Sequence, residues 1–504
     1  YSYQKMIPQF SREDVSSILY YLGKFISGFG IMMVVPIIVG LINKEWGPSL
    51  NFILSSLLCI SIGNIFYLKY PEEIDLNWRQ GMSLVAISWL IGMFLGALPL
   101  FLSGHYISYL DSCFESMSAF ATTGLTLVND LDHMAYSYNF WRHFMCFIGG
   151  QGIILVAMTF FVKGGSALKV YVGEAREEKI MPNMVQTARF IWFVSFTYLM
   201  IGTAILFFVN FFRHMSFGRA LFHSICLFMA GWDTAGFSVQ SQNILYYHSP
   251  IVEIVTGMIC LIGAINFGVH YAVWTGRPKE LIKNYELKVY IFSILSLFTI
   301  ICIAFIREFP FSCYFAFFRK TFYQLISAHT GVGYANILPF HFVQQWSALA
   351  VISLILAMGF GGSSSSTAGG IKILRLGIFI KGVKKEVRRL TSPESAVIIE
   401  KFHHIKDITI EDNHIKMAGI MIILYVTLYL VGGMIGTFYG YSFLSSLFES
   451  VSAAANVGLS MGITSVSMPN GLKMVYIVEM WMGRLEFISI FVLVKFILSL
   501  KSPQ

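Results

Sequence analysis

The stretch FESMSAFATTGLT at residues 114–126 is the first of four similar segments that decide how this chain folds. The other three are MAGWDTAGFS (229–238), FYQLISAHTGVGYA (322–335) and FESVSAAANVGLS (448–460). Each contains a glycine followed by a bulky apolar or aromatic residue and then a small one. These glycines, which lie 112, 97 and 125 residues apart, are Gly124, Gly236, Gly333 and Gly458. Recurrence at such intervals indicates repeated structural units.

The second copy departs from the pattern. In the first and last copies a phenylalanine stands ten residues before the glycine, whereas Phe222 stands fourteen residues before Gly236. We therefore expect the short helix of the second unit to be longer, or to start elsewhere.

Composition indicates that these units lie in a membrane. Of the 504 residues 56% are hydrophobic and only 12% are charged, whereas soluble domains are about 25% charged. Lipid must therefore cover much of the surface. A bilayer core takes about 20 apolar residues per helix, and ten segments meet that length: 17–42, 50–69, 81–103, 139–162, 188–212, 250–275, 286–306, 345–381, 415–439 and 473–499. Four shorter apolar segments are expected not to cross: 111–123, 218–233, 316–330 and 443–456.

The distribution of Lys and Arg predicts the orientation. With both termini in the cytoplasm, the cytoplasmic loops hold most of the cations, including the clusters Lys163 to Arg189 and Arg277 to Lys288. All four short segments then lie on the outer face. The net charge of +8 is modest, and we expect no nucleic-acid partner.

The predicted architecture is an all-α integral membrane protein. Two leading transmembrane helices come first, and four pseudo-fourfold repeats of helix, pore helix, loop and helix surround one central ion pathway. The expected divisions are 1–70 for the leading helices, 81–165, 186–277 and 284–385 for the first three repeats, 386–412 for a cytoplasmic connection and 413–501 for the fourth repeat.

Four loops that meet on one axis predict a cation site. Non-helical backbone is tolerated at membrane depth only where it is buried in protein or lines a watery cavity. Carbonyl oxygens can replace the water shell of a monovalent cation, and glycine supplies the positive φ angles that aim them inward. The expected filter residues are Thr122, Thr123, Gly124, Thr234, Ala235, Gly236, Gly331, Val332, Gly333, Asn456, Val457 and Gly458.

These repeats resemble the Trk/Ktr/HKT superfamily of cation uptake proteins, and bacterial Trk potassium-uptake membrane subunits in particular. Further similar segments are LFHSICLFMAGWDTAGFS (221–238), GGSSSSTAGGIK (361–372) and MGRLEF (482–487). The resemblance implies potassium as the transported ion, no organic cofactor, a homodimer with one pore per subunit, a cytosolic nucleotide-binding regulatory subunit and a location in the bacterial inner membrane. In that superfamily a glycine at all four filter positions goes with potassium, and a serine in the first loop goes with sodium.

A run of glycine and serine interrupts the segment 345–381 and predicts a gate. A continuous helix there would cost about 1 kcal/mol per glycine relative to alanine, so we expect a break within the membrane. The run lacks the Gly-Lys-Ser/Thr ending of a phosphate-binding loop, and a plain flexible kink is the rival interpretation. The resemblance implies an intramembrane gating loop, and the expected gate residues are Gly361, Gly362, Ser363, Ser364, Ser365, Ser366, Thr367, Ala368, Gly369 and Gly370.

Arg484 is the other candidate gate residue. It lies near the middle of the last long segment, where a charge costs about 2.5–3.5 kcal/mol. Its neighbours three and four residues away include no acid. We expect it to face the pore near the glycine–serine break, where it holds the loop or tempers cation passage. The alternative is a structural arginine satisfied by carbonyl groups at a helix contact.

Three further features have weaker functional interpretations: two glutamates and one basic stretch. Glu115 and Glu449 open the matching FES motifs and could orient the loops by accepting backbone N–H bonds, or could simply cap the pore helices. The basic stretch Lys381 to Arg389 suits anionic membrane lipids, with a regulatory partner as its rival.

Other functional classes fit the sequence less well. A secondary transporter would show inverted repeats and paired broken helices, whereas these repeats share one orientation and only one long helix looks broken. A membrane enzyme would show clustered acid, base or metal ligands, and none is evident. Sodium or mixed monovalent-cation transport is the serious competitor to potassium uptake.

Overall fold

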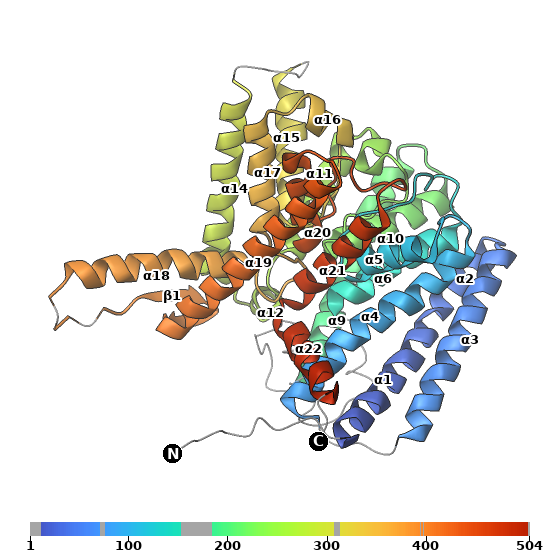
Figure 1. Cartoon of the computed structure of the whole chain (residues 1–504). Coiled ribbons are helices and arrows are strands. Elements are labelled where there is room, and N and C mark those ends of the chain that lie inside the picture. The colour runs from blue at the N-terminus through green and yellow to red at the C-terminus, as the bar shows by residue number, and fades with distance from the viewer. Residues whose placement is uncertain are drawn as a thin grey trace.

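The computed structural model describes residues 12–70, 76–152, 184–306, 313–393, 395–396 and 398–501. Within these ranges the regular secondary structure is helical apart from one two-stranded antiparallel hairpin (Figure 1). The second half of the expected segment 139–162, and the basic cluster that begins at Lys163 as far as residue 183, lie outside the described residues.

Three leading helices form one edge of the molecule (Figure 1). They are α1 (Arg12–Met32), α2 (Val34–Ile42) and α3 (Trp46–Lys69). Helices α1 and α3 pack closely because small residues face each other: a Cβ on Gly23 would lie 2.7 Å from the carbonyl oxygen of Gly63. Small residues at such contacts are typical of helices that pack within a membrane.

Four units follow, each made of a long helix, a short helix, a loop and a second helix. The first two comprise α4 (Trp78–Leu102), α5 (Tyr109–Phe120), α6 (Tyr136–Gln151), α9 (Met184–Phe211), α10 (Phe217–Trp232), the 3₁₀ turn η1 (Asn243–Tyr247), α11 (Pro250–Gly263) and α12 (Phe267–Trp274). The last two comprise α13 (Glu280–Lys283), α14 (Tyr285–Ala304), α15 (Tyr314–His329), α16 (Pro339–Gln344), α17 (Ala348–Gly359), α18 (Ile373–Thr391), α19 (Asp412–Phe438), α20 (Phe443–Ala454), α21 (Asn470–Leu485) and α22 (Ile488–Lys501).

The four short helices α5, α10, α15 and α20 stop at the same point relative to the repeated glycines. Each ends four residues before its glycine, at Phe120, Trp232, His329 and Ala454. Their lengths differ: α10 and α15 each have 16 residues, and α5 and α20 each have 12. The longer short helix expected for the second unit is therefore confirmed.

The second helix is interrupted in the second, third and fourth units, and the expectation of a single broken helix is wrong. Helix α6 ends at Gln151, α17 ends at Gly359, and α21 and α22 are separated by left-handed residues at Glu486 and Phe487. Helices α11 and α12 meet at a bend of 96°. Six helices among the described residues are long and apolar enough to cross a membrane, or seven if that bent pair counts as one span.

A steric constraint accounts for these interruptions. Each second helix passes the end of its short helix at a glycine, where an added Cβ would overlap a carbonyl oxygen. Gly149 meets Phe120, Gly263 meets Trp232 and Gly483 meets Ala454 in this way, and Gly361 lies 3.0 Å from the oxygen of His329 by the same measure. Glycine-containing segments do not hold a straight helix well.

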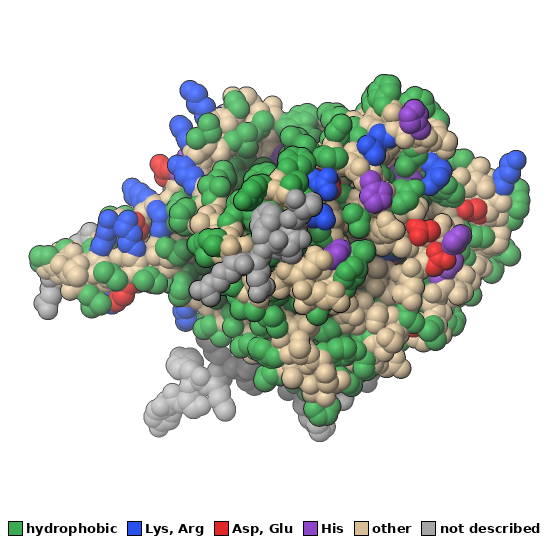
Figure 2. All heavy atoms as spheres, turned by 90° about the horizontal axis from the view of Figure 1, so that it is seen from above, with side chains coloured by type: hydrophobic (Ala, Val, Ile, Leu, Met, Phe, Trp, Pro, Cys, Tyr) green, Lys and Arg blue, Asp and Glu red, His purple; other side chains and the backbone are tan. Residues whose placement is uncertain are grey.

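The loop-bearing units are joined to an arm that projects from the body (Figure 1). The arm consists of α18 and the hairpin of β1 (Lys401–His404) and β2 (Lys406–Thr409). Figure 2 shows Lys and Arg side chains gathered on this projection, while hydrophobic side chains cover much of the body. Several of these cations already have partners, because Lys385 pairs with Asp412 and Arg388 pairs with Glu400.

Replacing Gly483 by alanine tests this constraint. The added methyl group would press on the carbonyl oxygen of Ala454, and overpacking of this kind costs about 1–3 kcal/mol. We expect Gly483→Ala to lower the unfolding temperature of the detergent-solubilised protein, measured by tryptophan fluorescence. Gly218→Ala is the matched control, because nothing lies within 4 Å of a Cβ there. Equal unfolding temperatures for the two variants would contradict the steric account.

Candidate functional site

The four repeated glycines form a closed ring of close backbone contacts. A Cβ on Gly124 would overlap the carbonyl oxygen of Ala235 in the second loop. The same relation continues around the ring, from Gly236 to Val332, from Gly333 to Val457 and from Gly458 back to Thr123. Each loop therefore contacts the next through the residue just before that loop's glycine. No side chain fits at any of the four positions without moving the neighbouring loop.

The loops share one backbone conformation as well as one arrangement. All four glycines have a positive φ, between 61° and 95°. The residues two positions earlier, Thr122, Thr234, Gly331 and Asn456, are left-handed too. The amide between each such pair donates to the carbonyl five residues back, as Thr123 N does to Ser118 O at 2.8 Å and Val457 N to Ser452 O at 2.8 Å. These bonds fix each loop to the C-terminal end of its short helix, which carries the negative end of the helix dipole.

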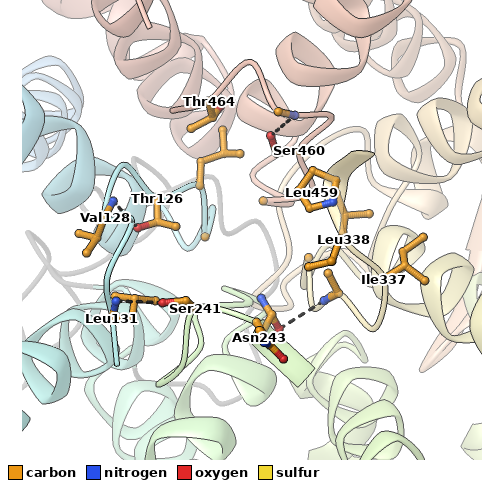
Figure 3. Close-up of a pocket in the computed structure, with 18 of the residues that line it drawn as sticks. Thr126, Val128, Leu131, Ser241, Asn243, Ile337, Leu338, Leu459, Ser460 and Thr464 are labelled. Atoms are coloured by element: carbon orange, nitrogen blue, oxygen red, sulfur yellow. Dashed lines mark hydrogen bonds between the residues drawn. The ribbon is translucent and has the colours of Figure 1, made fainter. Parts of the chain in front are cut away.

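A cavity of about 280 Å³ opens on one side of this ring. It is lined by segments that follow all four glycines, and Figure 3 shows them around the opening: Thr126, Val128, Leu131, Ser241, Asn243, Ile337, Leu338, Leu459, Ser460 and Thr464. Hydrogen bonds tie the segments together, from Leu131 N to Ser241 Oγ at 3.0 Å and from Ala335 N to Asn243 Oδ1 at 3.3 Å. We call the side that holds this cavity the loop face.

Glu115 supports the first loop from behind. Its carboxylate accepts bonds from Leu127 N at 3.0 Å and from Thr126 Oγ1 at 2.8 Å, and it forms an ion pair with Arg142 at 2.7 Å. Both charged side chains are fully buried. The role expected for Glu115, orienting its loop through a backbone N–H, agrees with these contacts, although its partner Arg142 was not expected.

Glu449 supports the fourth loop without a cation. It accepts bonds from Met461 N at 2.9 Å and Ile463 N at 3.1 Å, and from the hydroxyl groups of Ser460 and Thr464. The third unit has Gln324 at the matching position, where its amide donates to Asn336 Oδ1 at 2.8 Å. Four donors thus replace the arginine that balances Glu115.

The glycine–serine run forms a loop that crosses beneath the ring, on the side opposite the cavity. We call residues 360–372 the crossing loop; it joins α17 to α18. Thr367 Oγ1 donates to the carbonyl oxygens of Trp232 and Gly263, at 3.1 Å each. A Cβ on Gly331 would lie 3.5 Å from Ala368 Cβ, which brings the loop against the third glycine loop.

The rest of the crossing loop is held by groups from other helices. Ser364 N donates to Glu286 Oε1 at 2.6 Å, and Asn266 Nδ2 donates to Ser364 Oγ at 3.2 Å. Ser363 N donates to Ala264 O and Gly362 N donates to His329 O. Lys372 Nζ donates to the carbonyl of Ala368. Sequence reasoning did not single out Glu286, Asn266 or Lys372 for this role, since they lie far from the loop in sequence or at its end.

Arg484 lies where the crossing loop meets the first glycine loop. Its guanidinium donates to Thr367 O at 2.5 Å, to Gly149 O at 2.8 Å and to Thr122 Oγ1 at 3.3 Å. Two interpretations of Arg484 were possible from the sequence: a structural arginine bound by carbonyl groups, or a residue that contacts the glycine–serine loop. The structure shows both kinds of contact. Glu486, two residues on, pairs with Arg375 instead.

A family model described as a cation transport protein, TrkH, matches residues 48–503. The chain belongs to the TrkH cation transport family. It is accordingly a multi-pass integral membrane protein that transports cations and is not an enzyme. Among the residues that the structure describes, no group of three or more His, Cys, Asp or Glu side chains could hold a metal ion.

Relatives of this TrkH-family chain span nearly its whole length. An uncharacterized cation transporter of Methanocaldococcus jannaschii is 30% identical over 489 residues, which cover 97% of each chain. The Trk system potassium uptake protein TrkG of Escherichia coli is 27% identical and covers 92% of this chain and 94% of its own. The crystal structure of the potassium transporter TrkH from Vibrio parahaemolyticus has the same fold, with a TM-score of 0.82 at 23% identity over 95% of this chain and 98% of that one.

The buried ion pair of this TrkH-family chain gives a testable difference between its two FES glutamates. Glu115→Gln leaves Arg142 buried without a counter-charge, and breaking a buried pair costs about 3–5 kcal/mol. Glu449→Gln leaves no cation behind, and a buried group that loses its hydrogen-bond partner costs about 1–3 kcal/mol. We expect the unfolding temperature to fall further for Glu115→Gln, as measured by thermal unfolding in detergent. A larger fall for Glu449→Gln would contradict the role given to Arg142.

Proposed function

We propose that this protein takes up potassium through the ring of four glycine loops. The observation that carries the proposal is the closed ring of contacts, in which each filter glycine meets the carbonyl of the next loop. Twelve residues predicted from the repeats, three in each loop, take part in this ring or adjoin it. Because no side chain fits at the four glycines, the groups nearest the centre of the ring are backbone carbonyl oxygens. Such oxygens can replace the hydration shell of a monovalent cation.

The electrostatics of the four units favour a cation at that point. The C-terminal ends of the four short helices point at the ring. Each end carries the equivalent of about half a negative elementary charge. The loop face carries the cavity through which an ion would reach the ring, and it corresponds to the outer face of the membrane expected from the Lys and Arg distribution. The proposal includes four repeats with pseudo-fourfold symmetry around a single pathway and both termini in the cytoplasm.

The crossing loop and Arg484 are proposed as the gate. The loop lies directly behind the ring, at a depth where irregular backbone is tolerated only if it is buried in protein or lines a watery path. Arg484 links Thr367 of the crossing loop to Thr122 of the first glycine loop. Its positive charge on the path repels an incoming cation, and its bond to Thr367 O holds the loop across the path.

The regulatory assembly is proposed from the relatives. Several of them are named as potassium uptake proteins of a Trk system, which supports partner subunits for this chain. A homodimer, a cytosolic nucleotide-binding subunit and a bacterial inner-membrane location are the corresponding proposals.

Transport of sodium or of several monovalent cations is the alternative function. Because more than one long helix is broken, helix breaks do not distinguish this protein from a secondary transporter. The common orientation of the four units still does, since a secondary transporter would have inverted repeats.

Replacing Gly124 by serine tests the ion preference. The new Cβ would meet the carbonyl of Ala235, so the ring must widen at the first loop and lose its fit to potassium. We expect the unaltered protein to restore growth of a potassium-uptake-deficient strain at low external potassium, and Gly124→Ser to fail. Gly462→Ser is the matched control, because it also has a positive φ but open space around it. No growth with the unaltered protein would overturn potassium uptake, and equal rescue by Gly124→Ser would remove Gly124 from the selectivity argument.

Removing the charge of Arg484 tests the gate. Arg484→Ala deletes the bond to Thr367 O and the positive charge beside the path, so we expect potassium-dependent ⁸⁶Rb⁺ uptake into proteoliposomes to rise severalfold. Arg375→Ala is the comparison, because it also removes an arginine and that arginine pairs with Glu486. Unchanged flux and unchanged regulation in Arg484→Ala would contradict the proposed role.

A further inference from the structure

An apolar groove of about 310 Å³ runs between α11 and α15 on the outside of the helical body. The two helices come from the second and third units and lie side by side (Figure 1). The rims of the groove are exposed apolar side chains, including Met258, which is 57% exposed, and Phe318, which is 50% exposed. Gly257 and Tyr323 form part of its lining, so the groove is deep where the glycine leaves room.

The length of the groove matches one leaflet of a bilayer. It extends along α11 from Pro250 to Leu261 and along α15 from Phe315 to Ile326. At 1.5 Å per residue each side is about 16 Å long, and half of a hydrocarbon core of about 30 Å is about 15 Å. Both helices begin at the loop face and run inward, so the groove lies in the leaflet on that side.

The end of the groove near the loop face carries a cation with free donor capacity. Arg319 Nε lies 3.4 Å from Glu253 Oε2, yet among the described residues neither atom has a hydrogen-bond partner. Lys320 follows Arg319 directly in the sequence, and both cations act electrostatically on the single carboxylate of Glu253. A guanidinium presents several N–H donors in a plane that suits phosphate oxygens.

We propose that this groove binds an anionic phospholipid of the leaflet on the loop face. One acyl chain lies along Gly257 and Met258, and the phosphate accepts hydrogen bonds from Arg319. The apolar lining matches the chain, its length matches one leaflet, and the surplus of positive charge matches a headgroup with a net negative charge. This inference rests on the membrane location of the family and does not depend on the identity of the transported ion.

A lipid in this position would brace the third glycine loop. Ile326, at the inner end of the groove, lies five residues before Gly331. A hydrogen bond of 3.0 Å between Thr256 Oγ1 and Tyr323 Oη joins α11 to α15 beside the groove. An occupied groove therefore adds packing to a short helix whose end fixes one quarter of the ring.

The test uses the full chain in proteoliposomes of phosphatidylethanolamine that contain a small fraction of phosphatidylglycerol with a diazirine in the middle of one acyl chain. After illumination, mass spectrometry locates the labelled peptides. We expect labelling to concentrate on residues 250–261 and 315–326. Gly257→Leu fills the groove, since its Cβ would make an ordinary contact of 3.8 Å with the Tyr323 ring, and should lower this labelling at least fivefold.

Two further variants separate the groove from general lipid contact. Gly419→Leu adds the same side chain on α19, where its Cβ would lie 3.9 Å from Phe379, and should leave the labelling unchanged. Arg319→Gln keeps the groove open and should remove at least a threefold preference for the phosphatidylglycerol probe over a phosphatidylcholine probe.

Three results would overturn the proposal. The first is labelling spread evenly over the lipid-facing helices, and the second is labelling unchanged in Gly257→Leu. The third is the absence of lipid label from the groove together with a crosslink, formed by a zero-length crosslinking reagent, between α11 of one copy of the chain and α15 of another. That result would identify the groove as an interface between copies. Elution of each variant at the volume of the unaltered protein in size-exclusion chromatography establishes that it is folded.

Discussion

The closeness of the four glycine loops is the constraint on which the rest of the structure depends. A side chain at Gly124, Gly236, Gly333 or Gly458 would occupy the place of a carbonyl oxygen in the adjacent loop. Backbone packed this tightly needs support on every side, because polar groups left bare in lipid cost several kcal/mol each. The short helices, the Glu115 and Glu449 hydrogen bonds and the crossing loop all supply that support.

The broken second helices follow from the same crowding. For four short helices to converge, each second helix must pass close to the end of one of them, and only glycine allows that approach. The breaks in turn free carbonyl groups at the depth of the ring. Gly149 O and Gly150 O accept from Arg484, and Gly263 O accepts from Thr367. Carbonyl groups at the breaks therefore help to satisfy the half-buried Arg484.

Sequence alone predicted the four short helices and the glycines because both are local patterns: apolar length and a recurring residue. It missed the breaks in the second and fourth units. Segment 250–275 is apolar enough to pass as one span, and hydropathy does not register the bend between Gly263 and Phe267. A signal was available, because Gly149, Gly263, Gly361 and Gly483 follow the loop glycines by 25, 27, 28 and 25 residues.

The hydrogen-bond partners of Arg484 lie 117 to 362 residues away in the sequence. Only the tertiary fold brings them together, so the sequence could not decide between a gate role and a structural role for Arg484. The residue boundaries expected for the units and the roles of the gate residues remain predictions.

Backbone symmetry and side-chain symmetry are separate in this protein. Nine residues before each loop glycine stand Glu115, Leu227, Gln324 and Glu449. Glu115 pairs with an arginine, Gln324 bonds an asparagine and Glu449 gathers four donors, while Leu227 only receives the hydroxyl of Tyr334 at its carbonyl, at 2.7 Å. The ring requires the same backbone from every unit but leaves the supporting side chains free to differ. That freedom allows one unit alone to extend its helix break into the crossing loop and another to supply Arg484 against it.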